Sequence, residues 1–226
     1  MREYASKEAL AAGFADVIAR HLSDAVAANG RAVLAVSGGS TPKALFKALS
    51  TRALDWSAVS VLPVDERWVP EDSERSNARL VRENLLVNEA RAAGFVSLHH
   101  PAAEPETGLD HVRLAVDALP RPFDVVILGM GTDGHTASFF PGGDLLARAM
   151  ARDTVETVVP MRAPGAGEPR VTLTLPLIVE ARHLFLHIEG EEKRAVLRAA
   201  EAGEDVEEMP VRAVLDAANL EVVWAP

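Results

Sequence analysis

The chain of 226 residues contains no cysteine, which excludes disulfide bonds, thiolate nucleophiles and zinc sites built from thiolates. No run approaches about 18 apolar residues, so we expect no membrane-spanning helix. The start lacks a basic stretch followed by an apolar one, and we expect a cytoplasmic location. Basic residues do not balance the acidic ones, and the net charge of -10 argues against a nucleic acid or an anionic membrane as partner.

Short apolar strands alternate with amphipathic helices along most of the sequence. We expect strands at 31–36, 58–64, 123–128, 183–188 and 220–225, and helices near 10–26, 42–49, 77–86, 109–119 and 191–203. This alternation predicts an α/β fold with a Rossmann-like, mostly parallel sheet and helices on both faces. The Pro- and Gly-rich stretch 163–169 is interpreted as a surface loop, because the alternation continues across it. We therefore expect a single domain, residues 1–226.

Three polar motifs each follow directly from the end of a predicted strand. They are "SGGSTP" at 37–42, "DERWVP" at 65–70 and "GMGTDGH" at 129–135. In open α/β sheets, ligands bind outside the carboxyl ends of the strands. The three motifs together therefore predict a ligand site at this edge of the sheet.

The third motif has the G-x-G-x-x-G spacing of a dinucleotide-binding turn, in Gly129, Gly131 and Gly134. That turn must open a helix long enough to cross the sheet, which takes roughly a dozen residues. Here "PGG" at 141–143 ends any helix within about two turns. The sequence therefore favours a different use for these glycines, and we expect no nicotinamide, flavin or other cofactor.

Asp133 and His135 lie in this same turn. Imidazole has an unperturbed pKa of about 6.5, which makes it a usable general base at neutral pH. A tight turn without chemistry remains the alternative. A histidine at a strand's carboxyl end, beside a carboxylate and glycines that admit a ligand, favours catalysis.

The first motif allows two chemical interpretations. Ser37 could be the nucleophile of a strand-to-helix elbow, but Ala35 breaks the G-x-S-x-G pattern of such elbows. Anion binding fits better, because backbone N–H groups and hydroxyls precede a predicted helix. The residues expected to bind a phosphate monoester are Gly38, Gly39, Ser40 and Thr41. A helix-capping turn without a ligand stays open.

Taken in order, the motifs resemble the 6-phosphogluconolactonase family, in the fold group shared with glucosamine-6-phosphate deaminase and ribose-5-phosphate isomerase. The resemblance covers nearly the whole chain. Its segments are 37–42, 65–70 with 76–77, 129–142, 170–176 and 190–194. The resemblance implies hydrolysis of 6-phospho-D-glucono-1,5-lactone, a small sugar-phosphate substrate, by a monomer or small homo-oligomer.

The resemblance also implies roles for individual residues. His135 would be the base that activates water, Asp133 would orient its ring, and Gly131 would bring backbone close to the substrate. Arg170 and Lys193 would supply positive charge for the phosphate, although without the family pattern both would be interpreted as solvated surface residues. Asp65 and Arg67 would contact the sugar or its phosphate, or pair with each other.

The remaining candidates carry weaker signals. Asn77 is a weak site candidate, and Trp68 is interpreted as a packing residue. The other histidines considered have no partner pattern and are interpreted as structural or exposed: His99, His100, His111, His183 and His187. No His/carboxylate set has metal-ligand spacing, so we expect no metal.

Two alternatives to the lactonase stay open. In the deaminase, the segment around the corresponding histidine typically resembles "GHIAFNEPG", with an acid before the proline. Here Ser138, Phe139 and Phe140 precede Pro141, and the sequence departs from the deaminase pattern. A sugar-phosphate sensor without chemistry would need only the basic and glycine groups, and the presence of Asp133 and His135 disfavours it.

Overall fold

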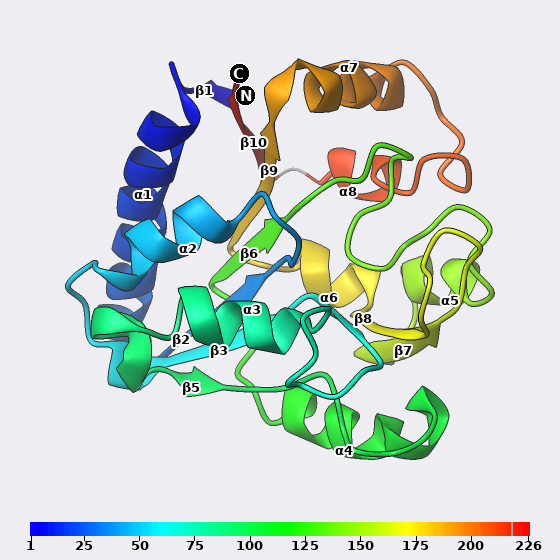
Figure 1. Cartoon of the computed structure of the whole chain (residues 1–226), viewed down its shortest axis with the longest axis horizontal. Helices are drawn as coiled ribbons and strands as arrows, with labels where there is room; N and C mark the ends of the chain where they lie inside the picture. The colour runs from blue at the N-terminus through cyan, green and yellow to red at the C-terminus, as the bar shows by residue number, and fades with distance from the viewer. Residues whose placement is uncertain (218) are drawn as a thin grey trace.

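The computed structural model describes residues 1–217 and 219–226. These residues form a central sheet of seven strands in the order β1-β10-β9-β6-β2-β3-β5, and all neighbouring strands run parallel (Figure 1). Its strands are β1 (Arg2–Glu3), β2 (Ala32–Val36), β3 (Val59–Pro63), β5 (Gly94–Phe95), β6 (Val125–Leu128), β9 (His183–Glu189) and β10 (Leu220–Ala225). The expected parallel sheet is confirmed. The two chain ends lie side by side, because β1 pairs with β10.

Helices cover both faces of this sheet, as the alternation of elements predicts. They are α1 (Lys7–Asn29), α2 (Lys43–Ser50), α3 (Asn77–Asn84), α4 (Pro105–Asp117), α5 (Leu146–Met150), α6 (Leu175–Val179), α7 (Gly190–Glu201) and α8 (Arg212–Leu215). Two short 3₁₀ turns lie at Trp56–Ala58 and Asn88–Ala92. None of the helices within the described ranges is long and apolar enough to cross a membrane.

The core has two parts, one on each face of the sheet. Alternate side chains of a strand point to opposite faces. On β6, Val125 and Ile127 therefore pack with α1, α2 and α3, while Val126 and Leu128 pack with α4 to α8. This division explains why the central strands read as continuous apolar runs.

The long helix α1 has clear sequence signals at both of its ends. Ser6 caps it by accepting a hydrogen bond from the backbone N–H of Ala9 at 3.2 Å. The helix ends at Asn29, directly before Gly30, which the sequence predicts as the stop. Its buried face supplies Leu10, Phe14 and other apolar side chains to the core beside β2.

A second, small sheet was not expected from the sequence. Among the described residues it has three antiparallel strands in the order β4-β8-β7: β4 (Asp65–Arg67), β8 (Arg170–Leu173) and β7 (Val158–Met161). Asp65 pairs with Thr172, and Arg67 pairs with Arg170. The stretch 163–169, expected as a surface loop, connects β7 to β8. The small sheet thereby brings polar residues from distant parts of the chain to the edge of the large one.

Candidate active site

A cavity of about 420 Å³ lies at the carboxyl ends of β2, β6 and β9, the edge where the sequence predicts a ligand site. The structure brings ten of the expected site residues to its wall: Gly38, Gly39, Ser40, Thr41, Asp65, Arg67, Gly131, His135, Arg170 and Lys193. Asp133 is the remaining expected residue, and it contacts His135 from behind. A cavity of this size accommodates a small sugar phosphate.

The chain leaves β6 in a tight turn that carries the histidine. The N–H of Gly131 donates to the carbonyl of His135 at 2.8 Å, and the N–H of Gly134 donates to the carbonyl of Gly131 at 3.2 Å. No helix follows within reach of a dinucleotide, because the next one, α5, begins only at Leu146. The dinucleotide interpretation is therefore rejected on the structure as well.

Asp133 and His135 form a hydrogen-bonded pair, with 2.6 Å between Asp133 Oδ1 and His135 Nδ1. The hydrogen bond with the imidazole is the main cause that lowers the pKa of Asp133 from 3.8 to about 2. An ionised carboxylate can only accept, so Nδ1 carries the proton and Nε2 presents its lone pair. His135 Nε2 makes no hydrogen bond with any residue that the structure describes. This is the arrangement that a general base requires.

Gly131 allows this pair to form. A Cβ on Gly131 would lie 2.1 Å from Nδ1 of His135 and 2.4 Å from Oδ1 of Asp133. Phe140 holds the other side of the imidazole, with ring centroids 4.3 Å apart. The glycine therefore provides space for the side chains of Asp133 and His135.

The backbone after His135 adopts an unfavourable conformation that side chains hold in place. Ala137 has a φ of 49°, in the left-handed region, which costs a non-glycine residue about 1–2 kcal/mol. On either side, the Thr136 hydroxyl donates to the carbonyl of Gly129 at 2.8 Å, and the Ser138 hydroxyl donates to Asp65 Oδ2 at 2.6 Å. The segment that distinguishes this chain from the deaminase pattern is thus fixed to β4.

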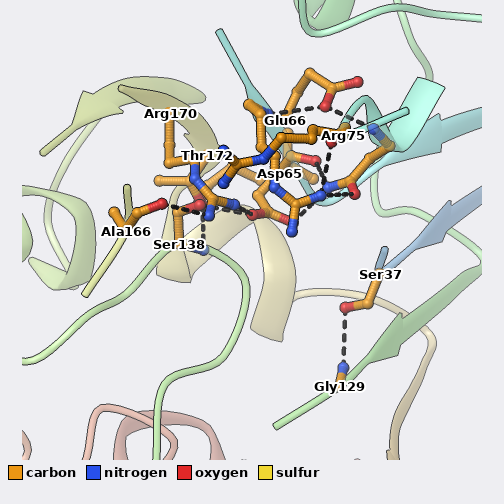
Figure 2. A network of polar contacts seen from close by, with 12 residues as sticks. Ser37, Asp65, Glu66, Arg75, Gly129, Ser138, Ala166, Arg170 and Thr172 are labelled. Atoms are coloured by element: carbon orange, nitrogen blue, oxygen red, sulfur yellow. Dashed lines mark hydrogen bonds and ion pairs between the residues drawn. The ribbon is translucent and has the colours of Figure 1, made fainter. Parts of the chain in front are cut away.

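Arg170 provides positive charge on the small sheet. Its side chain reaches Asp65 at 3.6 Å and donates to the carbonyl of Ala166 at 2.7 Å (Figure 2). Only 7% of the residue is exposed, and its Nε has no hydrogen-bond partner in the described part of the chain. Burial is the main cause that lowers the pKa of Arg170. A buried guanidinium needs a compensating negative charge, and Asp65 provides part of it.

Arg67 gives the same wall a second buried donor. It donates to the carbonyl of Arg75 at 2.7 Å and to Asn77 Oδ1 at 3.2 Å, while its Nε lacks a partner among the residues seen in the structure. The alternative that Asp65 pairs with Arg67 is wrong, because Asp65 forms its ion pair with Arg170. The acid between them, Glu66, instead caps α3 by accepting from backbone N–H groups.

Asn77 has a larger part in the site than its weak sequence signal indicates. Its amide donates to the carbonyl of Asp65 at 2.8 Å and its oxygen accepts from Arg67. A Cβ on Gly38 would lie 1.9 Å from this oxygen. Asn77 therefore connects the glycine loop after β2 to the residues of β4, which only the folded chain brings together.

Lys193 and the first motif form the opposite wall. Lys193 lies on α7 and lines the cavity, and burial is the main cause that lowers its pKa. Arg170 is buried and is therefore not a solvated surface residue, whereas Lys193 is half-buried. The Ser37 hydroxyl accepts from the N–H of Gly129 at 2.9 Å (Figure 2) and forms no hydrogen bond with His135 in the described structure. The geometry gives no support to a serine nucleophile.

The remaining sequence interpretations have mixed outcomes. Trp68 is a packing residue, with its indole N–H donating to the carbonyl of Ala102 at 2.8 Å. His100 and His111 stack on each other. His187, however, lines the cavity, and the i, i+2 spacing to Glu189 was the signal that could have revealed it. Across residues 1–217 and 219–226, no group of three or more possible metal ligands occurs.

Comparisons with known proteins identify the family and the fold of the chain. The model of the family "Glucosamine-6-phosphate isomerases/6-phosphogluconolactonase" matches residues 5–224. A 6-phosphogluconolactonase of Rhizobium meliloti is 50% identical, and the match covers 100% of this chain and 98% of the relative. The crystal structure of a 6-phosphogluconolactonase from Shewanella baltica has a TM-score of 0.96 at 42% identity, covering 100% and 97% of the two chains.

A more distant solved structure bears on the fold alone. It is a monomeric glucosamine-6-phosphate deaminase, with a TM-score of 0.80 at 19% identity over 100% of this chain and 97% of its own. The expectation of a deaminase-like fold is confirmed.

Proposed function

The chain belongs to the family of glucosamine-6-phosphate isomerases and 6-phosphogluconolactonases, and on this premise we propose its reaction and its site. It is an enzyme that hydrolyses 6-phospho-D-glucono-1,5-lactone to 6-phosphogluconate, in the oxidative pentose phosphate pathway. The relatives of high identity are named 6-phosphogluconolactonase, and this chain matches them over nearly their full lengths. The observation on the chain itself that supports the reaction best is the Asp133–His135 pair beside the cavity.

His135 acts as the general base. Its Nε2 takes a proton from water as the water oxygen attacks the lactone carbonyl, and a tetrahedral oxyanion forms. When the ring C–O bond breaks, the imidazolium returns the proton to the departing oxygen, which becomes a hydroxyl of the product. Asp133 keeps the proton on Nδ1 throughout and stabilises the transient positive charge. The donors proposed for the oxyanion are backbone N–H groups of the glycine turns that do not already donate within the protein, which excludes those of Gly129, Gly131 and Gly134.

The phosphate lies between the glycine loop and the basic residues. Backbone and hydroxyl groups of residues 38–41 bind its oxygens, with Lys193 and Arg170 providing the compensating charge. Arg67, Arg170 and Lys193 line one cavity together with this glycine loop, which supports the placement. Asp65 positions Arg170 and Ser138. A small local group of cations is needed because the net charge of the chain is -10.

Four further expectations stay predictions. The chain is proposed to be a single α/β domain, because the small sheet and the large sheet share one hydrophobic cluster. A monomer or small homo-oligomer and a cytoplasmic location are proposed with it, without a nucleic-acid partner.

The test is an assay of purified protein with lactone generated in situ, corrected for spontaneous hydrolysis. We expect the wild type to accelerate hydrolysis, and His135→Ala to lose about 10²–10⁴ of the rate, the usual contribution of general base catalysis. A loss of only a few-fold would refute the role of His135. Ammonia release from glucosamine 6-phosphate would indicate a deaminase, and binding of 6-phosphogluconate without any hydrolysis would indicate a sensor.

A further inference from the structure

His187 is a buried side chain in the cavity wall that the proposed mechanism does not use. It lies near the carboxyl end of β9, and only 3% of it is exposed. Phe14 of α1 packs edge-on against its ring, with centroids 5.8 Å apart. The same cavity is lined by His135 and by the glycine loop. A fixed imidazole in a ligand cavity needs a physical explanation.

The hydrogen bonds of His187 identify which nitrogen faces the cavity. Its Nε2 lies 3.1 Å from Oε1 of Glu189, two residues further along the strand and therefore on the same face. A carboxylate can only accept, so Nε2 carries a proton. Nδ1 has no hydrogen-bond partner among the described residues, yet it is not one of their fully enclosed, unpaired polar atoms. Because His187 lines the cavity and its Nε2 is bonded to Glu189, Nδ1 is the ring nitrogen left for a ligand.

The position of His187 in the sheet places it on the phosphate side of this cavity. Phe185 and Ile127, on β9 and the adjacent β6, belong to the core on the face covered by α1 and α2. His187 is two residues after Phe185 and points to the same face. The glycine loop, residues 38–41, leads into α2 on this side, and Lys193 lies one turn into α7, directly after β9.

We propose that His187 binds the substrate's phosphate through Nδ1 while Glu189 holds its Nε2–H. The proposal rests on the proposed function, which places the phosphate at the glycine loop. Lys7 of α1 lies 3.8 Å from Glu189, and Lys193 of α7 lines the same cavity as His187. The wall would then bind the phosphate with His187 and Lys193, two side chains from consecutive elements.

Three substitutions of His187 separate ligand binding from structural support. His187→Leu removes both nitrogens and keeps the apolar volume. The amide of His187→Asn reaches the position of Nδ1, whereas the amide of His187→Gln reaches the position of Nε2. The matched control is His183→Leu, at the other end of β9, where the ring stacks on His21 and does not line the cavity.

The measurements are KM and kcat for the lactone, and the inhibition constant of inorganic phosphate. We expect His187→Leu to raise KM and the phosphate inhibition constant about ten-fold or more, the contribution of a charge-assisted hydrogen bond. We expect kcat to stay within about three-fold, because His187 is not the base. His187→Asn should recover part of the binding, because its amide reaches the position of Nδ1. His187→Gln should bind as weakly as His187→Leu, and the control His183→Leu should match the wild type.

Several results would overturn the inference. Recovery by His187→Gln and not by His187→Asn would show that only the link to Glu189 matters. A raised KM with unchanged phosphate inhibition would move the contact from the phosphate to another part of the substrate. If the wild type is active and all three variants match it, the role of His187 is refuted and the proposed function stands. If the wild type is inactive, the proposed function itself is refuted.

Discussion

Gly131→Ala is the substitution that tests most directly how the catalytic turn is built. The new Cβ would lie 2.1 Å from Nδ1 and 2.3 Å from Cε1 of His135, where ordinary contacts begin at 3.4 Å. The imidazole must therefore move by about 1 Å or more, the shortfall in that contact. The backbone at this glycine is not in the left-handed region, so an alanine meets no conformational penalty there. The perturbation falls on the catalytic pair and not on the turn itself.

The expected loss follows from this displacement. A misplacement of about 1 Å costs roughly 100-fold in rate when the reacting groups must be aligned. Because His135 is partly exposed on its solvent side, its ring has room to move, and we expect the thermal stability to change little. The assay is the lactonase assay with in situ substrate, reported as kcat and KM separately. We expect kcat to fall about 100-fold and KM to change by less than three-fold.

Gly129→Ala is the matched control, two residues earlier in the same turn. Its Cβ would meet no atom closer than Ser37 Cβ at 3.7 Å, an ordinary contact. We expect its kcat to stay within about three-fold of the wild type. If Gly131→Ala keeps more than a tenth of the wild-type kcat, the alignment of His135 by the turn does not limit catalysis and the reasoning fails.

Two other substitutions test the electrostatics and the packing of the site. Asp133 has its pKa lowered to about 2 from 3.8, so its bond to His135 contributes stability above pH 4 that is lost as the pH falls through 2. Denaturant unfolding of wild type and Asp133→Asn should therefore differ at pH 5 and converge near pH 2; a difference that is constant with pH would contradict this. Gly38→Ala places a Cβ 1.9 Å from Oδ1 of Asn77, and we expect it to destabilise the fold by about 1–3 kcal/mol. Asn77→Gly should relieve part of that cost in the double variant, and strictly additive losses would show that the two residues do not clash.

The large sheet could be predicted because its strands carry local signals. Val33 to Val36 and Val125 to Leu128 are short apolar runs that end at glycine-rich turns, and helices with one apolar face separate them. Burial on both faces requires such runs, so composition alone identifies them. The alternation of these runs with helices then leaves a parallel sheet as the simplest architecture.

The small sheet could not be predicted in the same way. Its strand Asp65–Arg67 is three residues long and polar, and its partner is Arg170–Leu173. Such a strand has no periodicity to detect, since its pairing depends on contacts between distant segments. The burial of Arg170 depends on this pairing, so without the resemblance to the family its position in the sequence indicates only a surface residue.

The proposed catalytic residues were predictable for a different reason. Asp133 and His135 are two residues apart in one glycine-rich turn, and the chemistry of a carboxylate beside an imidazole can be inferred from that spacing. His187 and Glu189 have the same spacing on a strand, but an isolated buried histidine is more often a core residue. Only the cavity distinguishes the two pairs.

The glycines of the site illustrate how far a motif can be interpreted without a structure. The missing side chain of Gly38 makes room for Asn77, and that of Gly131 makes room for His135, so both serve contacts within the protein. Gly39 differs, because a Cβ there would meet no protein atom within 4 Å, although the residue lines the cavity. Its open side is where a phosphate can approach the backbone, so we expect the substrate to contact Gly39 directly. The spacing of glycines in a sequence shows where space is needed, and only the atoms opposite each one show whether a ligand or the protein itself occupies it.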